Sequence, residues 1–179
     1  MNKKFDLPSI SLILGGARSG KSHYAETLIE DFESPIYLAT AEAHHADDLY
    51  GEMAQRIAKH KEFRGDQWQT VEEPIDLVGK LNDYATSPVI VDCMTLWLAN
   101  ILSVGKSFDE EIEALTECLN TLTGPLVLVS NEVGQGIVPV NSLARSYMDN
   151  AGRMNQRLAA CAGQVVFMYA GIPQILKDE

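Results

Sequence analysis

The segment that most constrains the fold is a glycine-rich loop that directly follows the apolar run Ile10–Leu14. The loop reads Gly15-Gly16-Ala17-Arg18-Ser19-Gly20-Lys21-Ser22 and fits the pattern G-x-x-x-x-G-K-[ST]. Such a loop turns its backbone N–H groups inward around an anion, and the helix that follows adds free N–H groups and the positive end of its dipole. Lys21 would reach the terminal phosphates, and Ser22 would offer its hydroxyl to Mg²⁺. The motif therefore predicts a nucleoside triphosphate site on a strand–loop–helix unit.

Five short apolar runs predict the strands of one parallel sheet, because they show little of the alternation typical of a half-exposed strand. They are Ile10–Leu14, Pro35–Ala39, Pro88–Asp92, Pro125–Ser130 and Gln164–Tyr169. Helix-like segments separate them: Lys21–Phe32, Asp47–Phe63, Pro74–Asn82, Asp109–Leu122 and Ser142–Ala162. This alternation predicts an α/β protein, a single P-loop NTPase domain whose mostly parallel sheet is covered by helices on both faces. We expect one domain over residues 1–179, with residues 1–9 as a flexible extension.

The charge balance restricts the partners. Fourteen lysine and arginine residues against 25 aspartate and glutamate residues give a net charge of −11, which disfavours nucleic acids and anionic membranes as partners. No window holds the roughly 18 apolar residues of a membrane span, and no apolar core of a secretory signal follows the first lysines. Three widely spaced cysteines, Cys93, Cys118 and Cys161, are expected to be buried free thiols. We therefore expect a cytoplasmic protein.

A carboxylate is expected at the nucleotide site from the end of a buried strand. Ligands of such sheets lie beyond the carboxyl ends of the strands, and Asp92 ends the run Pro88–Asp92. Asp92 would hold Mg²⁺ directly or through water, together with Ser22. The guanine-reading signature Asn-Lys-x-Asp is absent from the sequence, which counts against a GTPase of the usual form.

A histidine lies in a basic patch within this acidic chain. His60 is flanked by Arg56, Lys59, Lys61 and Arg64. Nearby cations lower the pKa of an imidazole and keep it neutral, and a neutral imidazole is a nucleophile near pH 7. His60 could therefore form a phosphoramidate with a nucleotide. From the residues alone, a solvated helix end is an equally open interpretation of the patch.

Several motifs occur together along most of the chain, in the order GGARSGKS, LATAE, RIAKHKEFR, VDCMTLW and NEVGQGIVP. From about Ser11 to Ile175 the sequence resembles the bifunctional adenosylcobinamide kinase / adenosylcobinamide-phosphate guanylyltransferase family of cobalamin biosynthesis. The resemblance implies that a nucleoside triphosphate, ATP or GTP, phosphorylates adenosylcobinamide. GTP would then guanylylate His60, and the GMP would pass to adenosylcobinamide phosphate. Some members carry a second histidine where this chain has Lys59.

The same resemblance implies a set of site residues and a homotrimer. His60 and Lys21 would be catalytic, and Ser22 and Asp92 would bind Mg²⁺. The nucleotide-binding residues would be Gly15, Gly16, Ala17, Arg18, Ser19, Gly20, Lys21, Ser22, Thr40, Ala41, Glu42, Lys61, Glu62, Phe63, Arg64, Glu72 and Asp92. For the corrinoid end, Asn131 and Glu132 follow a strand at the expected ligand-binding edge.

The long helix expected over Ser142–Ala162 has two unlike faces. Arg145, Asp149, Gly152 and Gln156 lie on a polar face, and Leu143, Tyr147, Ala151, Met154 and Leu158 lie on an apolar one. Two other functions stay open from the sequence. One is a single-function P-loop kinase of another small alcohol, and the other is a non-catalytic or GTPase-type nucleotide sensor.

Overall fold

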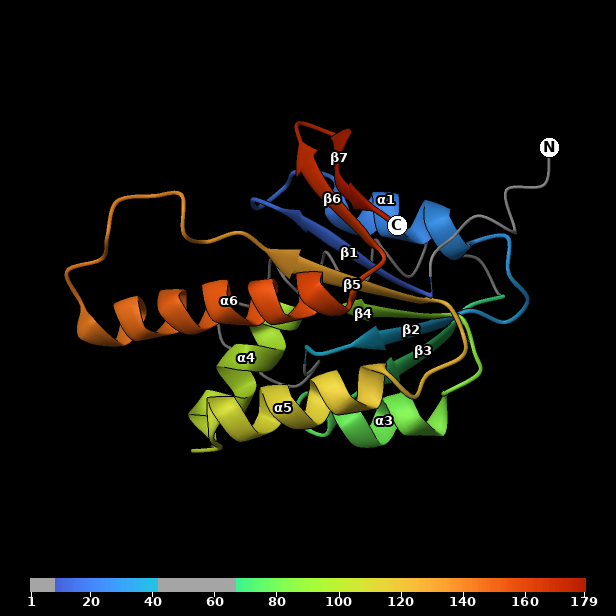
Figure 1. The fold of residues 1–179 in the computed structure, drawn as a ribbon, viewed down its shortest axis with the longest axis horizontal. Coiled ribbons are helices and arrows are strands. Elements are labelled where there is room, and N and C mark those ends of the chain that lie inside the picture. The colour runs from blue at the N-terminus through green and yellow to red at the C-terminus, as the bar shows by residue number, and fades with distance from the viewer. Residues whose placement is uncertain (1–8, 42–66) are drawn as a thin grey trace.

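The computed structural model describes residues 9–41 and 67–179, and within them the fold is a seven-stranded sheet with the strand order β3-β2-β4-β5-β1-β6-β7 (Figure 1). The strands are β1 Ile10–Gly15, β2 Ile36–Ala39, β3 Gln69–Glu72, β4 Val89–Asp92, β5 Leu126–Asn131, β6 Gln164–Tyr169 and β7 Ile172–Asp178. All neighbouring pairs are parallel except β6 and β7, which are antiparallel. The α/β class and the mostly parallel sheet are therefore confirmed.

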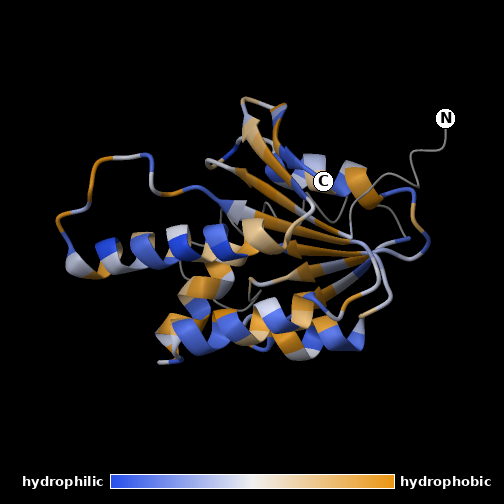
Figure 2. Cartoon of the chain, viewed as in Figure 1, coloured by the Kyte–Doolittle hydropathy of each residue, from blue (hydrophilic) through white to orange (hydrophobic). Residues whose placement is uncertain are grey.

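Helices cover both faces of the sheet. They are α1 Lys21–Ile29, α3 Leu77–Asp83, α4 Met94–Ser103, α5 Phe108–Leu119 and α6 Ser142–Cys161. In Figure 1, α1 lies behind the sheet, and the other four helices lie in front of it and below it. Side chains of β1 divide between the two layers, because Ile13 packs in the core with Ala25 and Ile29 of α1, whereas Leu12 packs in the other core with Trp97 of α4. This division explains the continuously apolar strands, which are orange in Figure 2.

Helix caps fix the starting points of three helices. Asn141 accepts hydrogen bonds from the backbone N–H groups of Leu143 and Ala144 at the start of α6. Ser107 caps α5, whose first turn is acidic, and Asp76 caps α3. The segment 132–141 before α6 extends away from the body of the protein in Figure 1, and we call it the arm.

Three elements were not expected from the sequence. Strand β3 is short and half-exposed, and β7 is an exposed edge strand, so neither is the apolar run that marks the central strands. Helix α4 is apolar around most of its circumference and therefore lacks amphipathic periodicity. The helix expected over Asp47–Phe63 lies outside the described residues.

Some finer expectations were wrong. Leu143, assigned to the apolar face of the long helix, has 76% of its surface exposed, because the first turns of α6 extend beyond the sheet. Cys118 is a buried free thiol as expected, but Cys93 and Cys161 are only half-buried. Helix α1 ends at Ile29 rather than at Phe32. None of the helices within the described ranges combines the length and the apolar character that crossing a membrane requires.

Candidate nucleotide-binding site

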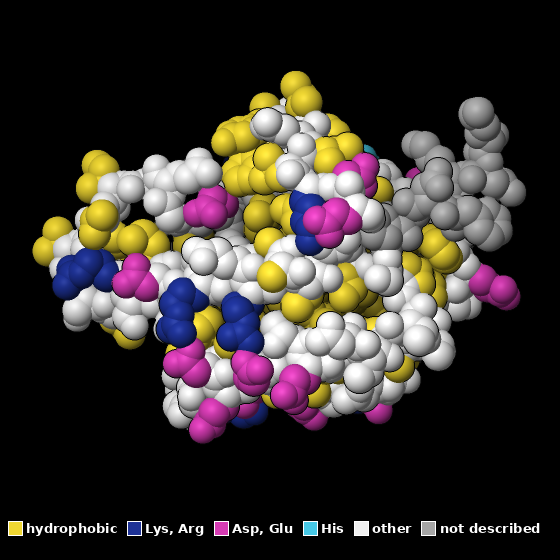
Figure 3. Space-filling view, in the orientation of Figure 1, with side chains coloured by type: hydrophobic (Ala, Val, Ile, Leu, Met, Phe, Trp, Pro, Cys, Tyr) yellow, Lys and Arg dark blue, Asp and Glu magenta, His cyan; other side chains and the backbone are white. Residues whose placement is uncertain are grey.

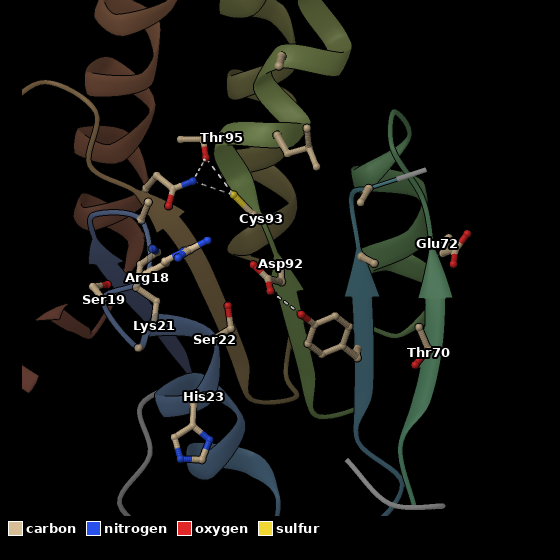
Figure 4. Close-up of a pocket in the computed structure, with 18 of the residues that line it drawn as sticks. Arg18, Ser19, Lys21, Ser22, His23, Thr70, Glu72, Asp92, Cys93 and Thr95 are labelled. Atoms are coloured by element: carbon tan, nitrogen blue, oxygen red, sulfur yellow. Dashed lines mark hydrogen bonds between the residues drawn. The ribbon is translucent and has the colours of Figure 1, made fainter. Parts of the chain in front are cut away.

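A pocket of about 650 Å³ opens at the carboxyl ends of the parallel strands, around the glycine-rich loop (Figure 4). The loop, β2, β3, β4, β5, α4 and α6 all contribute to its wall. The residues that line it are Ala17, Arg18, Ser19, Gly20, Lys21, Ser22, His23, Tyr37, Ala39, Ala41, Thr70, Glu72, Asp92, Cys93, Thr95, Leu96, Ala99, Asn131 and Tyr147. This is the edge at which ligands of open α/β sheets bind.

The glycine-rich loop has a backbone that requires glycine at two positions. Gly20 has φ +96°, and Gly15 has φ +150°. A Cβ atom on Gly15 would lie 2.7 Å from both the carbonyl oxygen of Met168 and the hydroxyl oxygen of Ser19, too close for any real contact. The turn between β6 and β7 holds the loop from outside, because the Gly171 N–H donates to the Ser19 carbonyl at 2.9 Å. The loop is thus a packed part of the fold, held by its contacts with β6 and with the turn between β6 and β7.

Lys21 begins α1 and lies inside the loop. Its ammonium Nζ donates to the Gly16 carbonyl at 2.7 Å, and only 7% of the residue is exposed. Burial lowers the pKa of Lys21, while the nearby Cys93 and Asp92 act in the opposite direction. A buried ammonium with one carbonyl partner can still donate to phosphate oxygens. Lys21 thus keeps donor capacity at the pocket that it lines.

Asp92 ends β4 and lines the pocket with its carboxylate. Its Oδ2 accepts a hydrogen bond from the Tyr37 hydroxyl of β2, as the dashed line in Figure 4 shows. Ser22 lines the same pocket from α1. No group of three or more histidine, cysteine or acidic side chains that could hold a metal ion occurs within residues 9–41 and 67–179. One carboxylate and one hydroxyl nevertheless suit Mg²⁺, which takes few protein ligands and completes its shell with water and phosphate oxygens.

The other residues expected at the site differ in their positions. Ala41 and Glu72 line the pocket, whereas Thr40 is fully buried beside it. The Thr40 hydroxyl accepts from the Cys93 N–H at 2.9 Å and donates to the Cys93 carbonyl at 2.8 Å, so it joins the ends of β2 and β4. Gly15 and Gly16 shape the loop without lining the pocket. The remaining expected residues, Glu42, His60, Lys61, Glu62, Phe63 and Arg64, lie outside the described residues.

A polar cluster lines the pocket beside the glycine-rich loop, and the sequence analysis singled out only Asn131 of its members. The Asn131 amide Nδ2 donates to the Thr95 hydroxyl at 2.8 Å and to the Cys93 sulfur at 3.4 Å, and the Thr95 and Cys93 side chains are 2.9 Å apart. The Tyr147 hydroxyl donates to the Thr95 carbonyl at 2.7 Å. For Asn131 the signal was its place after a predicted strand, whereas for Cys93 and Thr95 it was indirect, because they follow a predicted strand that ends in Asp92.

The thiol and the phenol of this cluster are neutral near pH 7. Burial, and secondarily Asp92, raises the pKa of the Cys93 thiol, while hydrogen bonds from Thr95 and Leu96 oppose the shift. Burial also raises the pKa of Tyr147, and the nearby Cys93 adds to the effect. The wall therefore offers neutral hydrogen-bonding groups to a ligand and no additional charge.

A glycine-rich loop between β1 and α1, together with a carboxylate at the end of β4, defines a nucleotide-binding protein of the P-loop class. Within that class, the chain belongs to the cobinamide kinase / cobinamide phosphate guanyltransferase family, whose sequence profile matches residues 11–176.

Two curated relatives agree with this assignment. The chain is 46% identical to the bifunctional adenosylcobalamin biosynthesis protein CobP of Pseudomonas aeruginosa over 94% of this chain and 97% of that protein. It is 38% identical to the bifunctional adenosylcobalamin biosynthesis protein CobU of Salmonella typhimurium over 90% of this chain and 96% of that protein. The family expected from the sequence motifs is thus confirmed.

Solved structures share the fold at low sequence identity. An ATPase of a type III secretion system superposes with a TM-score of 0.53 at 12% identity, covering 90% of this chain and 51% of the ATPase. The flagellar accessory protein FlaH of Methanocaldococcus jannaschii superposes with a TM-score of 0.51 at 13% identity, covering 97% of this chain and 80% of FlaH. These likenesses extend to the fold alone.

Proposed function

We propose that this protein carries out two successive reactions of cobalamin biosynthesis at the pocket described above. It phosphorylates the aminopropanol hydroxyl of adenosylcobinamide with a nucleoside triphosphate. It then transfers GMP from GTP to the resulting adenosylcobinamide phosphate and forms adenosylcobinamide-GDP. The observation that carries the proposal is a packed glycine-rich loop with buried Lys21, in a chain that matches the family over residues 11–176.

In the phosphorylation step, the substrate hydroxyl oxygen bonds to the γ-phosphorus, and the bond from that phosphorus to the β–γ bridging oxygen breaks. Lys21 stabilises the negative charge on the phosphate oxygens, and the loop N–H groups orient the phosphates. Mg²⁺ held by Ser22 and Asp92 would neutralise further phosphate charge. Either ATP or GTP serves as phosphate donor, because every contact assigned in this step is to the phosphates, which the two nucleotides share.

In the guanylyl step, the His60 imidazole attacks the α-phosphorus of GTP and pyrophosphate leaves with the electron pair of the broken bond. A phosphate oxygen of adenosylcobinamide phosphate then attacks the same phosphorus and releases the imidazole. The cations beside His60 in the sequence, Lys59, Lys61 and Arg64, keep the imidazole neutral and neutralise the phosphates. The covalent intermediate lets one site use two bulky substrates in turn. Glu42, Glu62 and Phe63 complete the nucleotide contacts in this proposal, with Ala41 and Glu72 from the pocket wall.

We propose further that the protein acts in the cytoplasm as a homotrimer. The arm carries Ile137 and Val140, each with 97% of its surface exposed, and the hairpin of β6 and β7 exposes Ile172. Figure 3 shows hydrophobic side chains on both projections. Apolar surface of this kind is typical of contacts between subunits.

The proposal is tested by following both reactions with purified protein. Adenosylcobinamide with ATP or GTP and Mg²⁺ should yield adenosylcobinamide phosphate, and GTP should then yield adenosylcobinamide-GDP with release of pyrophosphate. The Lys21→Ala variant should lose both products, whereas Asp109→Asn, on an exposed helix position, should retain them. Phosphorylation without any guanylyl product would favour a single-function kinase. Slow hydrolysis that is independent of cobinamide would favour a nucleotide sensor.

A further inference from the structure

Asn131 occupies a central position at the ligand-binding edge of the sheet. It is the last residue of β5, the strand that lies between the strand of the phosphate loop and the strand of Asp92. Asn131 is in register with Gly15 of the loop, whereas Asp92 is in register with Val129, two residues earlier. The Asn131 side chain lines the pocket. It therefore lies beyond the level of Asp92 at the carboxyl edge of the sheet.

The surrounding contacts fix this side chain. Its Nδ2 donates to the Thr95 hydroxyl and to the Cys93 sulfur, as the dashed lines in Figure 4 show. Its backbone carbonyl accepts from the Asn155 amide at 3.2 Å, and the Asn155 carbonyl oxygen in turn accepts from the Ser130 hydroxyl at 2.6 Å. Two helices, α4 and α6, thus hold Asn131 in one orientation. A group held in this way is preorganised for a ligand.

The orientation directs one unused atom away from Thr95 and Cys93. Both amide hydrogens are turned toward that pair, so the carbonyl oxygen Oδ1 points the other way, and within the described residues it has no hydrogen-bond partner. A carbonyl oxygen only accepts hydrogen bonds, so its partner must be an O–H or N–H group. The oxygens of a fully ionised triphosphate carry no hydrogen. The hydroxyl that receives the phosphoryl group does.

We propose that Asn131 orients the phosphoryl acceptor, with its Oδ1 accepting the hydrogen bond of the substrate hydroxyl and aligning that oxygen with the γ-phosphorus. This inference rests on the proposed phosphorylation step. As that step proceeds, the new O–P bond forms, the β–γ bridging bond breaks, and its electron pair leaves with the nucleoside diphosphate. The hydroxyl proton passes to the transferred phosphoryl group and then to solvent. The amide of Asn131 neither takes nor gives a proton, so its role is orientation alone.

The proposal makes the two reactions respond differently to Asn131. The attacking groups of the guanylyl step are an imidazole nitrogen and then an ionised phosphate oxygen, and neither presents a hydroxyl hydrogen to Oδ1. Loss of Oδ1 should therefore slow phosphorylation and spare guanylyl transfer. A merely structural role would impair both reactions.

The test compares Asn131→Ala with wild type in separate assays of the two reactions. We expect kcat for phosphorylation of adenosylcobinamide to fall about 10- to 100-fold, as for a misplaced reactant. Guanylyl labelling by GTP, and transfer to supplied adenosylcobinamide phosphate, should stay within about twofold of wild type, since the orienting contact is absent from both steps. The Mg²⁺ concentration for half-maximal activity should not change. Asn82→Ala, at an exposed position on α3, is the matched control and should behave as wild type.

Thr95→Val provides a second variant if Asn131→Ala does not fold. It keeps the shape of the side chain and removes the hydroxyl that holds the amide, so it should slow phosphorylation in the same selective way but less. Equal loss of both reactions, an unchanged phosphorylation rate, or a shift confined to the Mg²⁺ dependence would overturn the role of Asn131. Absence of phosphorylation by wild type would instead count against the proposed function.

Discussion

Tyr37 on β2 donates its phenolic hydrogen to Oδ2 of Asp92 on the adjacent strand β4. The bond joins a core residue to the carboxylate at the pocket edge, because Tyr37 is 6% exposed and its ring packs edge-on against Trp68. It occupies one carboxylate oxygen and leaves the other to face the pocket. The core of the protein therefore sets the direction of the Asp92 carboxylate at the pocket edge.

Tyr37→Phe tests this relationship. The variant keeps the ring and removes the donor, so Asp92 loses the bond that orients it, and outer-shell bonds of this kind typically contribute about 10- to 100-fold to metal affinity. We expect the Mg²⁺ concentration for half-maximal activity, and the Mn²⁺ affinity measured by electron paramagnetic resonance with nucleotide present, to weaken about tenfold. Tyr84→Phe, at the C-terminal end of α3 and not among the residues that line the pocket, should change neither. Equal metal affinity in Tyr37→Phe and wild type would contradict the assigned role.

Lys21 gives a prediction about pH. In the proposed mechanism the charged ammonium binds the triphosphate. Because burial lowers the pKa of Lys21, a larger fraction is neutral at a given alkaline pH than for a free lysine. Triphosphate binding should therefore weaken as the pH rises, beginning below about 10.4, the value of a free lysine. In this range, calorimetry in buffers of different ionisation enthalpy should show proton uptake on binding. Binding by Lys21→Ala should be weak and free of this uptake, and the same uptake in that variant would assign the titration to another group.

Adjacent glycines of the loop provide a matched pair for stability. Gly15→Ala places a Cβ 2.7 Å from the Met168 carbonyl oxygen in a backbone conformation of positive φ, whereas Gly16→Ala places one in open space. Overpacking of this kind costs about 1–3 kcal/mol. Denaturant unfolding should show that loss of unfolding free energy for Gly15→Ala and a change within about 0.5 kcal/mol for Gly16→Ala, as for an unconstrained position. Equal stability of the two variants would contradict the packing described for Gly15.

Thr40 gives a second stability prediction. Thr40→Val keeps the shape and leaves the backbone N–H of Cys93 without its partner, where β2 and β4 end, whereas the Cys93 carbonyl still accepts from the N–H groups of Leu96 and Trp97. An unsatisfied buried polar group costs about 1–3 kcal/mol, so the free energy of unfolding should fall by that amount. Thr27→Val is the control, because its exposed hydroxyl donates only to the Tyr24 carbonyl within the same helix. An equally large loss of unfolding free energy in Thr27→Val would show a general effect of replacing threonine by valine. It would contradict the role given to the bonds between Thr40 and Cys93.

The central part of the fold could be predicted from the sequence. The five apolar runs became β1, β2, β4, β5 and β6, since strands covered on both faces need apolar side chains at nearly every position. A strand at the edge of the sheet does not need apolar side chains at nearly every position. Strand β7 pairs only with β6 and exposes Ile172 and Leu176, so its sequence carries no burial pattern.

The candidate site was predictable where a motif determines it and not where tertiary contacts do. The loop from Gly15 to Ser22 was predictable because the backbone shape and the anion charge both dictate residue types. The placement of Thr40 was not predictable, because the sequence does not reveal that its hydroxyl forms hydrogen bonds with the backbone of Cys93. The link between Asn131 and Thr95 joins residues 36 apart and depends on the strand order, which local periodicity does not encode.

The claim on which the proposed mechanism depends is the transfer of GMP through His60, and mass spectrometry tests it directly. Protein incubated with GTP and Mg²⁺ should gain the mass of one GMP residue, and tandem spectra should place that mass on His60. The adduct should be lost in acid and stable in base, and it should be absent from His60→Ala and Lys21→Ala. Guanylyl transfer by wild-type protein that never carries the adduct, or an adduct that persists in His60→Ala, would contradict the mechanism.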